Sequence, residues 1–305
     1  MLEIVVKTEN WERHVRVSAG ELAGLVRRIG GGGDRFLVVQ RIPDLPDVFV
    51  QVWHEAGGDY QLEYRDGAPD RHFQAMVAGP ETVIAVLTGW AHQEAGWNAG
   101  LAWSSLNLPP NREAPPLDLD DDEREELEEE VRGALVGGYV SRAELAEIAE
   151  EYLVTSDRRP VSREQAQALA DRLWLERVAE QAELEGETDP ERLTRAFAAL
   201  EEAGVTAREN FACCRNCGHA EIGGEARPDA RGFVYFHRQC TPTAPVGQRL
   251  TLLYGSFDGS SETTVAIGHE VVAALEAVGL HTEWDRDPAR AITVTPLHWL
   301  RRLVG

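Results

Sequence analysis

The chain has 305 residues, which is enough for about two domains at the usual 100–200 residues each. It carries 30 Lys and Arg residues against 52 Asp and Glu residues, a net charge of −22, which argues against nucleic acid and anionic membranes as partners. Because no apolar run approaches the ~18 residues of a membrane span, and the N-terminus lacks a signal-peptide pattern, we expect a cytoplasmic protein.

The first 108 residues alternate short β-type segments with two helical patterns. Strands are predicted at 2–6, 14–18, 36–40, 48–55, 59–65 and 72–77, and helices at 19–29 and 81–93. Tight-turn sequences such as Gly57-Gly58 and Asp66-Gly67 separate the strands. This pattern predicts an antiparallel sheet with helices on one face, in a domain that ends at residue 108.

A Pro-rich linker is predicted at 109–117, and an acidic helical segment follows at 118–205. Ten of the thirteen residues at 118–130 are acidic. Three further helices are predicted, the first opening with the capping box of Ser141 and Glu144. Residues 109–205 carry 27 acids and 11 bases, a net charge of −16. The acidic run at 118–130 is interpreted as a solvated helix start that the helix dipole favours, and a basic protein partner at these helices is the alternative.

The last hundred residues, 206–305, return to a mixed pattern. Strands are predicted at 209–214, 233–239, 250–257, 281–285 and 291–296, with helices at 268–279 and 297–304. The predicted fold class is therefore α+β, with two antiparallel-sheet lobes joined by an acidic four-helix segment. We expect residues 118–305 to form one domain.

The four cysteines, Cys213, Cys214, Cys217 and Cys240, fall within 28 residues. Cys214 and Cys217, followed by His237 and Cys240, give the pattern C-x2-C…H-x2-C, which supplies two ligands from each of two turns to a tetrahedral zinc ion. Cys213 and His219 are alternative ligands. The sequence thus predicts a zinc site. On a strand, His237 and Cys240 would point to opposite faces, so this site requires that the strand predicted at 233–239 ends between them.

Two other interpretations of this cluster stay open. The cysteines can be reduced and packed as small apolar side chains without an ion. Alternatively, Cys214 or Cys217 is a nucleophile with His237 as its base. A weaker group, His54, Asp59, Glu63 and His72, is interpreted as solvated strand residues rather than as a metal or acid–base site.

The segments ENFACCRNCGHAEI, GFVYFHRQ, LLYGSF and VVAALEAVGLHTEWD, with the closing TPLHWLRRLV, resemble an uncharacterised family of actinobacterial proteins. The resemblance covers about residues 120–305 and implies no activity. It also implies that Asp often stands in relatives where this chain has Cys240, which favours Cys213, Cys214, Cys217 and His237 as ligands. Residues 1–108 resemble small polymorphic-toxin immunity proteins in composition.

We therefore expect a binding or regulatory protein, as an immunity protein or antitoxin is, with the Cys/His cluster as a structural zinc site. The alternative is an enzyme that uses the cluster as an open metal site or as a thiol nucleophile.

Overall fold

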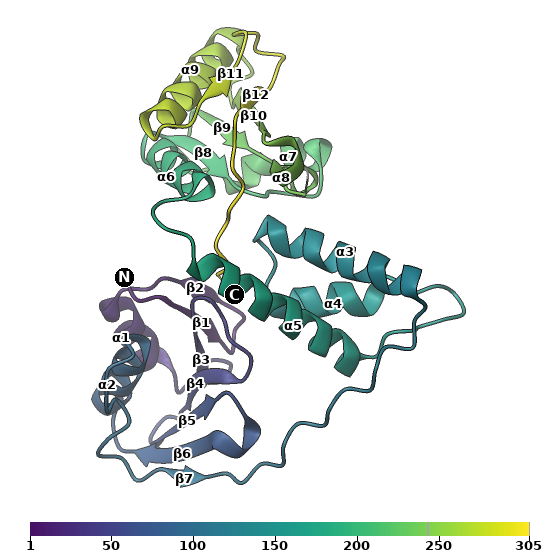
Figure 1. Cartoon of the computed structure of the whole chain (residues 1–305). Coiled ribbons are helices and arrows are strands. Elements are labelled where there is room, and N and C mark those ends of the chain that lie inside the picture. Colours follow the sequence, from purple (N-terminus) through teal and green to yellow (C-terminus); the bar gives the residue numbers. More distant parts are fainter. Residues whose placement is uncertain (243, 305) are drawn as a thin grey trace. The chain divides into compact units, whose positions relative to one another are not determined.

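A computed structural model of the chain describes residues 1–242 and 244–304. The chain folds into two compact units (Figure 1). The first comprises residues 1–127 and 140–178 with the last residues of the chain, and the second comprises 128–139 and 179–302. Each unit contains its own sheet, which confirms the predicted α+β class with two sheet lobes. Within the described ranges, no helix combines the length and apolar character needed to cross a membrane.

The first unit is built on a seven-stranded antiparallel sheet with the order β2-β1-β3-β4-β5-β6-β7. Its strands are β1 (Ile4–Thr8), β2 (Arg13–Val15), β3 (Phe36–Arg41), β4 (Val48–Trp53), β5 (Tyr60–Asp66), β6 (His72–Val77) and β7 (Ser104–Ser105). A 3-10 turn, η1 (Pro69–Arg71), precedes β6. The tight turns between β3 and β6 produce a meander in which consecutive strands pair.

Two neighbouring helices, α1 (Ala19–Arg28) and α2 (Pro80–Ala91), cover one face of this sheet (Figure 1). Alternate strand residues such as Val39, Val50 and Leu62 are fully buried in a core shared with these helices. Because side chains alternate across a strand, their neighbours in sequence point to the opposite face. Ser18 caps α1 through a capping box with Glu21, as the sequence pattern at that position favours.

The first unit also holds α4 (Arg142–Glu151) and most of α5 (Arg163–Ala182). Asp44, only 4% exposed, accepts a 2.9 Å hydrogen bond from Arg142 Nε through its carboxylate and a 2.6 Å bond from Trp174 Nε1 through its backbone carbonyl. Arg142 also pairs with Asp171 at 2.6 Å. These contacts attach α4 and α5 to the turn between β3 and β4, whereas α3 (Asp121–Gly137) contributes residues to both units.

The second unit has a five-stranded sheet with the order β11-β12-β10-β9-β8, in which β8 and β9 are parallel and the other pairs antiparallel. The strands are β8 (Val205–Arg208), β9 (Gly232–Tyr235), β10 (Leu250–Ser256), β11 (Thr282–Glu283) and β12 (Ile292–Val294). The helices and 3-10 turns are α6 (Asp189–Glu202), α7 (Arg215–Glu221), η2 (Ile222–Glu225), η3 (Arg238–Cys240), α8 (Ala244–Gly247) and α9 (Ser261–Ala277). Residues of α6 and α9 share the core with the sheet.

Two predicted elements of this unit are wrong. The strand lies at 205–208 rather than 209–214, because Asn210 and Ala212 have positive φ angles of 50° and 55° that turn the chain. Residues 297–304 do not form the predicted helix. Leu297 and Trp299 are buried while His298 and Leu300 are exposed, and this period of two belongs to extended chain.

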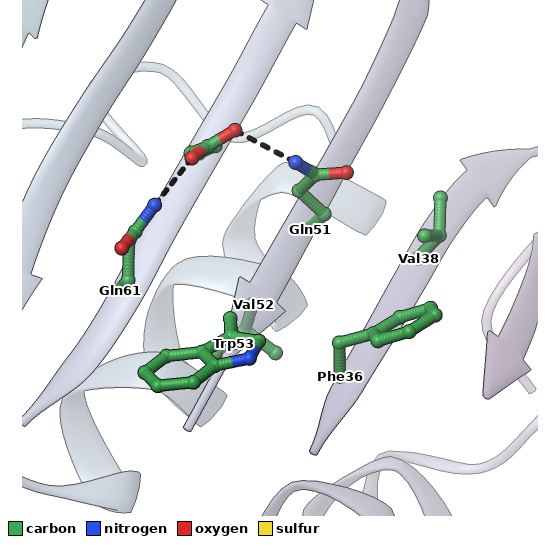
Figure 2. Close-up of a pocket in the computed structure, with 7 residues that line it drawn as sticks. Phe36, Val38, Gln51, Val52, Trp53 and Gln61 are labelled. Carbon is green, nitrogen blue, oxygen red and sulfur yellow. Dashed lines mark hydrogen bonds between the residues drawn. The ribbon is translucent and has the colours of Figure 1, made fainter. Parts of the chain in front are cut away.

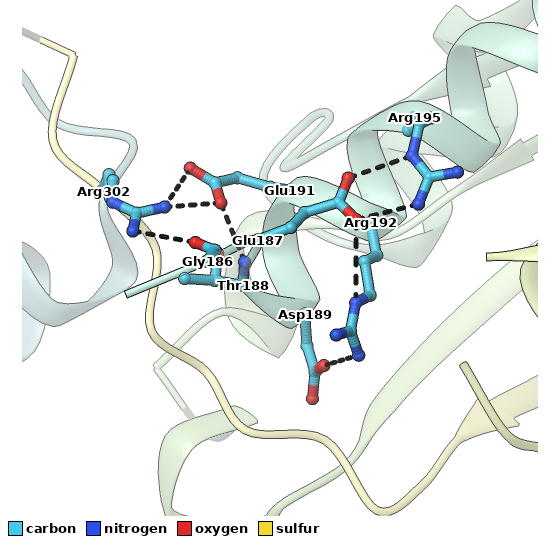
Figure 3. A network of polar contacts seen from close by, with 8 residues as sticks. All are labelled: Gly186, Glu187, Thr188, Asp189, Glu191, Arg192, Arg195 and Arg302. Carbon is cyan, nitrogen blue, oxygen red and sulfur yellow. Dashed lines mark hydrogen bonds and ion pairs between the residues drawn. The ribbon is translucent and has the colours of Figure 1, made fainter. Parts of the chain in front are cut away.

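The extended C-terminal segment is anchored to the start of α6 (Figure 3). Arg302 Nη1 lies 2.6 Å from both carboxylate oxygens of Glu191, and the same carboxylate accepts a 2.8 Å bond from the backbone N–H of Thr188. Asp189 accepts a 2.8 Å bond from the backbone N–H of His298. Asp189 and Glu191, in the first turn of α6, therefore hydrogen-bond to the extended C-terminal segment. Its polar groups at these positions have partners without forming a helix.

Candidate metal centre

The cysteine segment follows β8 and leads into α7. The backbone N–H of Phe211 bonds to the carbonyl of Phe236 at 2.8 Å, and the N–H of Arg238 bonds to the carbonyl of Ala212 at 3.2 Å. These bonds fix the cysteine segment beside the chain that leaves β9. Cys214 is the N-cap residue of α7, with extended backbone angles, and Cys217 lies in the first turn of the helix. The C-x2-C spacing thus spans a helix start.

The Sγ atoms of Cys213, Cys214 and Cys217 all lie within 4.8 Å of one another. Cys213 is exposed and the other two are half-buried, and none of the three forms a disulfide. Ligands of a tetrahedral zinc ion at about 2.3 Å are about 3.8 Å apart, so these thiols need only a small adjustment to share one ion. In the part of the chain that the structure describes, this is the one such close group of three metal-ligating side chains.

The electrostatics of the cluster make its three thiols unequal. The backbone N–H of Cys217, assisted by the side chains of Cys217 and Cys213 and the N–H of Asn216, lowers the pKa of Cys214. Hydrogen bonds to Cys213 and Cys214, with repulsion from their charges, raise the pKa of Cys217 to about 12. A thiolate at Cys214 therefore opposes ionisation of Cys217. A bound divalent cation would stabilise three thiolates at the same time.

His237 and Cys240 form a separate pair. β9 ends at Tyr235, and Cys240 lies in the short turn η3, with its Sγ 3.6 Å from both ring nitrogens of His237. Burial lowers the pKa of His237 and raises the pKa of Cys240, so both groups stay neutral at pH 7. The predicted four ligands are thus found as two pairs, Cys214 with Cys217 and His237 with Cys240, and Cys213 joins the first.

His219, the second alternative ligand, faces the sheet. Its Nδ1 is 2.8 Å from Tyr235 Oη, which also lies 3.0 Å from the carbonyl of Arg215. A carbonyl only accepts, so Tyr235 donates to Arg215 and the Nδ1–H of His219 donates to Tyr235. Burial, and to a smaller extent the charge of Arg215, lowers the pKa of His219. This imidazole is therefore neutral, and its hydrogen bond to Tyr235 connects α7 to β9.

Gly218 explains why α7 lies so close to the sheet. A Cβ at this position would be 2.5 Å from Cε2 of Tyr235 and 2.7 Å from its Oη, well inside van der Waals contact. Tyr235 is fully buried, so the helix approaches the ring only through a residue without a side chain. The role of Tyr235 was not predicted from the sequence, although the Gly that directly follows C-x2-C was a usable signal for a close approach.

The family model described as Domain of unknown function (DUF6891) matches residues 120–303. No curated protein and no solved structure matches the chain. Because the match spans more than half of the sequence, the chain belongs to the DUF6891 family. This result agrees with the resemblance to an uncharacterised domain family, and the matched region includes every residue of the cysteine cluster.

Proposed function

We propose that this DUF6891 protein is a binding or regulatory protein in which Cys213, Cys214 and Cys217 hold a structural zinc ion. The proposal rests on the three Sγ atoms that lie within 4.8 Å of one another at the start of α7. Sulfur ligands favour zinc over magnesium or calcium, which prefer oxygen. Helix N–H groups directed at Cys214 supply the additional hydrogen bonds that ligand atoms in metal sites usually receive.

We assign the fourth position to His237. Its backbone segment is hydrogen-bonded to that of the cysteines through Arg238 and Ala212, which supports this assignment. The lowered pKa of His237, caused by burial, keeps the imidazole in the neutral form that binds metal. Cys240 packs partly against the core and is the less suitable ligand.

A closed set of three sulfurs and one nitrogen leaves no position on the ion for a substrate, which is why the proposed role is structural. The ion would tie the chain after β8 to the chain after β9 and so stabilise this end of the second unit. A protein of this kind acts through its surfaces. We assign a basic protein partner to the acidic segment 109–205, which has a net charge of −16, as in an immunity protein or antitoxin.

Elemental analysis of the purified chain tests the metal site. We expect about one zinc per chain, retained in Cys240→Ser and lost in Cys214→Ser and Cys217→Ser. Cys240→Ser is the matched control because it removes a thiol that lies outside the three-sulfur group. A metal-free protein that folds equally well with and without chelator would contradict the proposal. Loss of zinc in Cys240→Ser would contradict the proposed ligand set, because it would show that Cys240 rather than Cys213 is the third sulfur ligand.

A second candidate function is thiol chemistry, which the half-exposed position of Cys214 at a helix start favours. In this alternative Cys214 is the nucleophile of an enzyme. One thiol that reacts with iodoacetamide at least tenfold faster than the others, in protein shown to contain no metal, would support it. Uniform slow reaction in the metal-free protein would exclude it.

A further inference from the structure

A cavity of about 460 Å³ opens on the face of the first sheet opposite α1 and α2. Strand register explains how its lining residues meet, since residues paired across antiparallel strands lie side by side on one face. Two cross-strand rows over β3, β4 and β5 form it, Phe36–Trp53–Gln61 and Val38–Gln51–Glu63. Figure 2 shows the two aromatic rings at one end of the cavity and the two glutamine side chains at the other.

Glu63 is the centre of the polar end. Its carboxylate accepts hydrogen bonds from Gln51 Nε2 at 2.7 Å and from Gln61 Nε2 at 2.6 Å, and it lies 3.1 Å from His72 Nε2. The side chain is only 13% exposed. Three groups thus hold one carboxylate in a fixed position.

His72 donates to Glu63 from the ring nitrogen that faces it. Nε and Nη2 of Arg65 lie 3.2 and 3.1 Å from its Nδ1, and because a guanidinium only donates, Nδ1 accepts these bonds. The proton that His72 donates to Glu63 is therefore on Nε2. His72 is 5% exposed, so the interpretation of Glu63 and His72 as solvated strand residues is wrong.

At the polar end of the cavity, the atoms left for a ligand are mainly acceptors. Gln61 directs its Nε2 to Glu63 and, at 3.3 Å, to Gln74, which uses both amide hydrogens. Gln51 directs its Nε2 to Glu63 and turns its Oε1 away from it (Figure 2). The glutamines therefore present carbonyl oxygens beside a carboxylate. No Lys or Arg is among the residues that line the cavity.

We propose that this cavity binds a small organic ammonium ion with an apolar or aromatic body. Its N–H groups would donate to Glu63 and to the glutamine oxygens. Its body would lie against Phe36 and Trp53, whose rings are 37% and 38% exposed and attract a cation through their faces. The volume is within the range of about 300–1,000 Å³ that is typical of small-molecule sites. The donors that the lining leaves are the indole N–H of Trp53 and one amide hydrogen of Gln51, and no cationic side chain lines the cavity, so an anion finds no opposite charge there.

Calorimetry with three probes that share a phenylethyl body tests the proposal on the full chain. 2-Phenylethylammonium has both charge and N–H donors, its N-trimethyl derivative has charge alone, and 2-phenylethanol has neither the charge nor the three donors. We expect the primary ammonium to bind at least tenfold more tightly than the alcohol, with the trimethyl compound between them. Absence of measurable binding of the ammonium, or equal affinity for the alcohol, would overturn the proposal.

Variants locate the bound probe. Glu63→Gln and Trp53→Ala should each weaken binding of 2-phenylethylammonium at least tenfold, whereas Glu55→Gln, at an exposed position beyond the end of β4, should not change it. Because Trp53 is part-exposed, its replacement leaves the core intact, and thermal unfolding of each variant verifies this. Unchanged binding in both site variants would refute the assignment to this cavity. The zinc content of the same samples separates this result from the proposed metal site.

Discussion

Replacement of Gly218 by Ala is the sharpest test of how α7 is positioned. The added Cβ would lie 2.5 Å from Cε2 of Tyr235, where ordinary contacts are 3.4–4 Å, so the ring or the helix must move by about 1 Å. The ring is fully buried and hydrogen-bonds Arg215 and His219, which leaves it little room to retract. Overpacking of this kind costs about 1–3 kcal/mol, and loss of the Tyr235 hydrogen bonds about 1 kcal/mol more.

Hydrogen exchange measured by mass spectrometry gives the local opening free energy of α7 and β9, which we expect to fall by about 2–4 kcal/mol in Gly218→Ala. Gly223→Ala is the matched control, since no atom lies within 4 Å of its added Cβ, and it should change exchange by less than about 0.5 kcal/mol. Equal exchange in the Gly218 variant and the parent chain would refute the argument from close approach.

Three further predictions concern the two units. Glu191→Gln should lower the stability of the second unit by about 1–2 kcal/mol in urea unfolding, because charge-assisted bonds to Arg302 are weakened at a part-exposed site; an unchanged midpoint would contradict this. Burial opposes ionisation of Glu191, but the hydrogen bonds from Arg302 and from the Thr188 N–H outweigh it and lower the pKa of Glu191. The stabilisation by this carboxylate should therefore be full above the ordinary pKa of 4.5 and disappear as the pH falls through the lowered pKa. Urea unfolding midpoints measured between pH 3 and 7 would show this loss. Asp44→Asn should destabilise the first unit by about 2–4 kcal/mol, since Arg142 then keeps only Asp171 as a charged partner, and a loss below about 0.5 kcal/mol in urea unfolding would contradict this.

The local patterns predicted most of the fold. Alternation at 36–40 and 48–55 located β3 and β4, and the Ser141 capping box located the start of α4. The prediction failed where non-local contacts or backbone conformation decide. The positive φ angles of Asn210 and Ala212 end β8 before the cysteines, and hydrogen bonds to Gln248 and Asp189 keep residues 297–298 extended.

The candidate site was predicted in part. C-x2-C spacing identified Cys214 and Cys217, because both residues lie in one helical turn. Inclusion of Cys213 depends on the turn before α7, and the separate pairing of His237 with Cys240 depends on where β9 ends, which spacing alone does not specify. Contacts between strands are equally invisible in the sequence, which is why Glu63 and His72 were assigned to solvent.

X-ray absorption spectroscopy of the zinc-loaded chain tests the central claim most directly, because it counts the atoms bound to the ion. We expect about three sulfur ligands at about 2.3 Å and one nitrogen at about 2.0–2.1 Å, with one sulfur lost in Cys213→Ser. A shell of nitrogen and oxygen without sulfur, or a spectrum unchanged in Cys213→Ser, would contradict it.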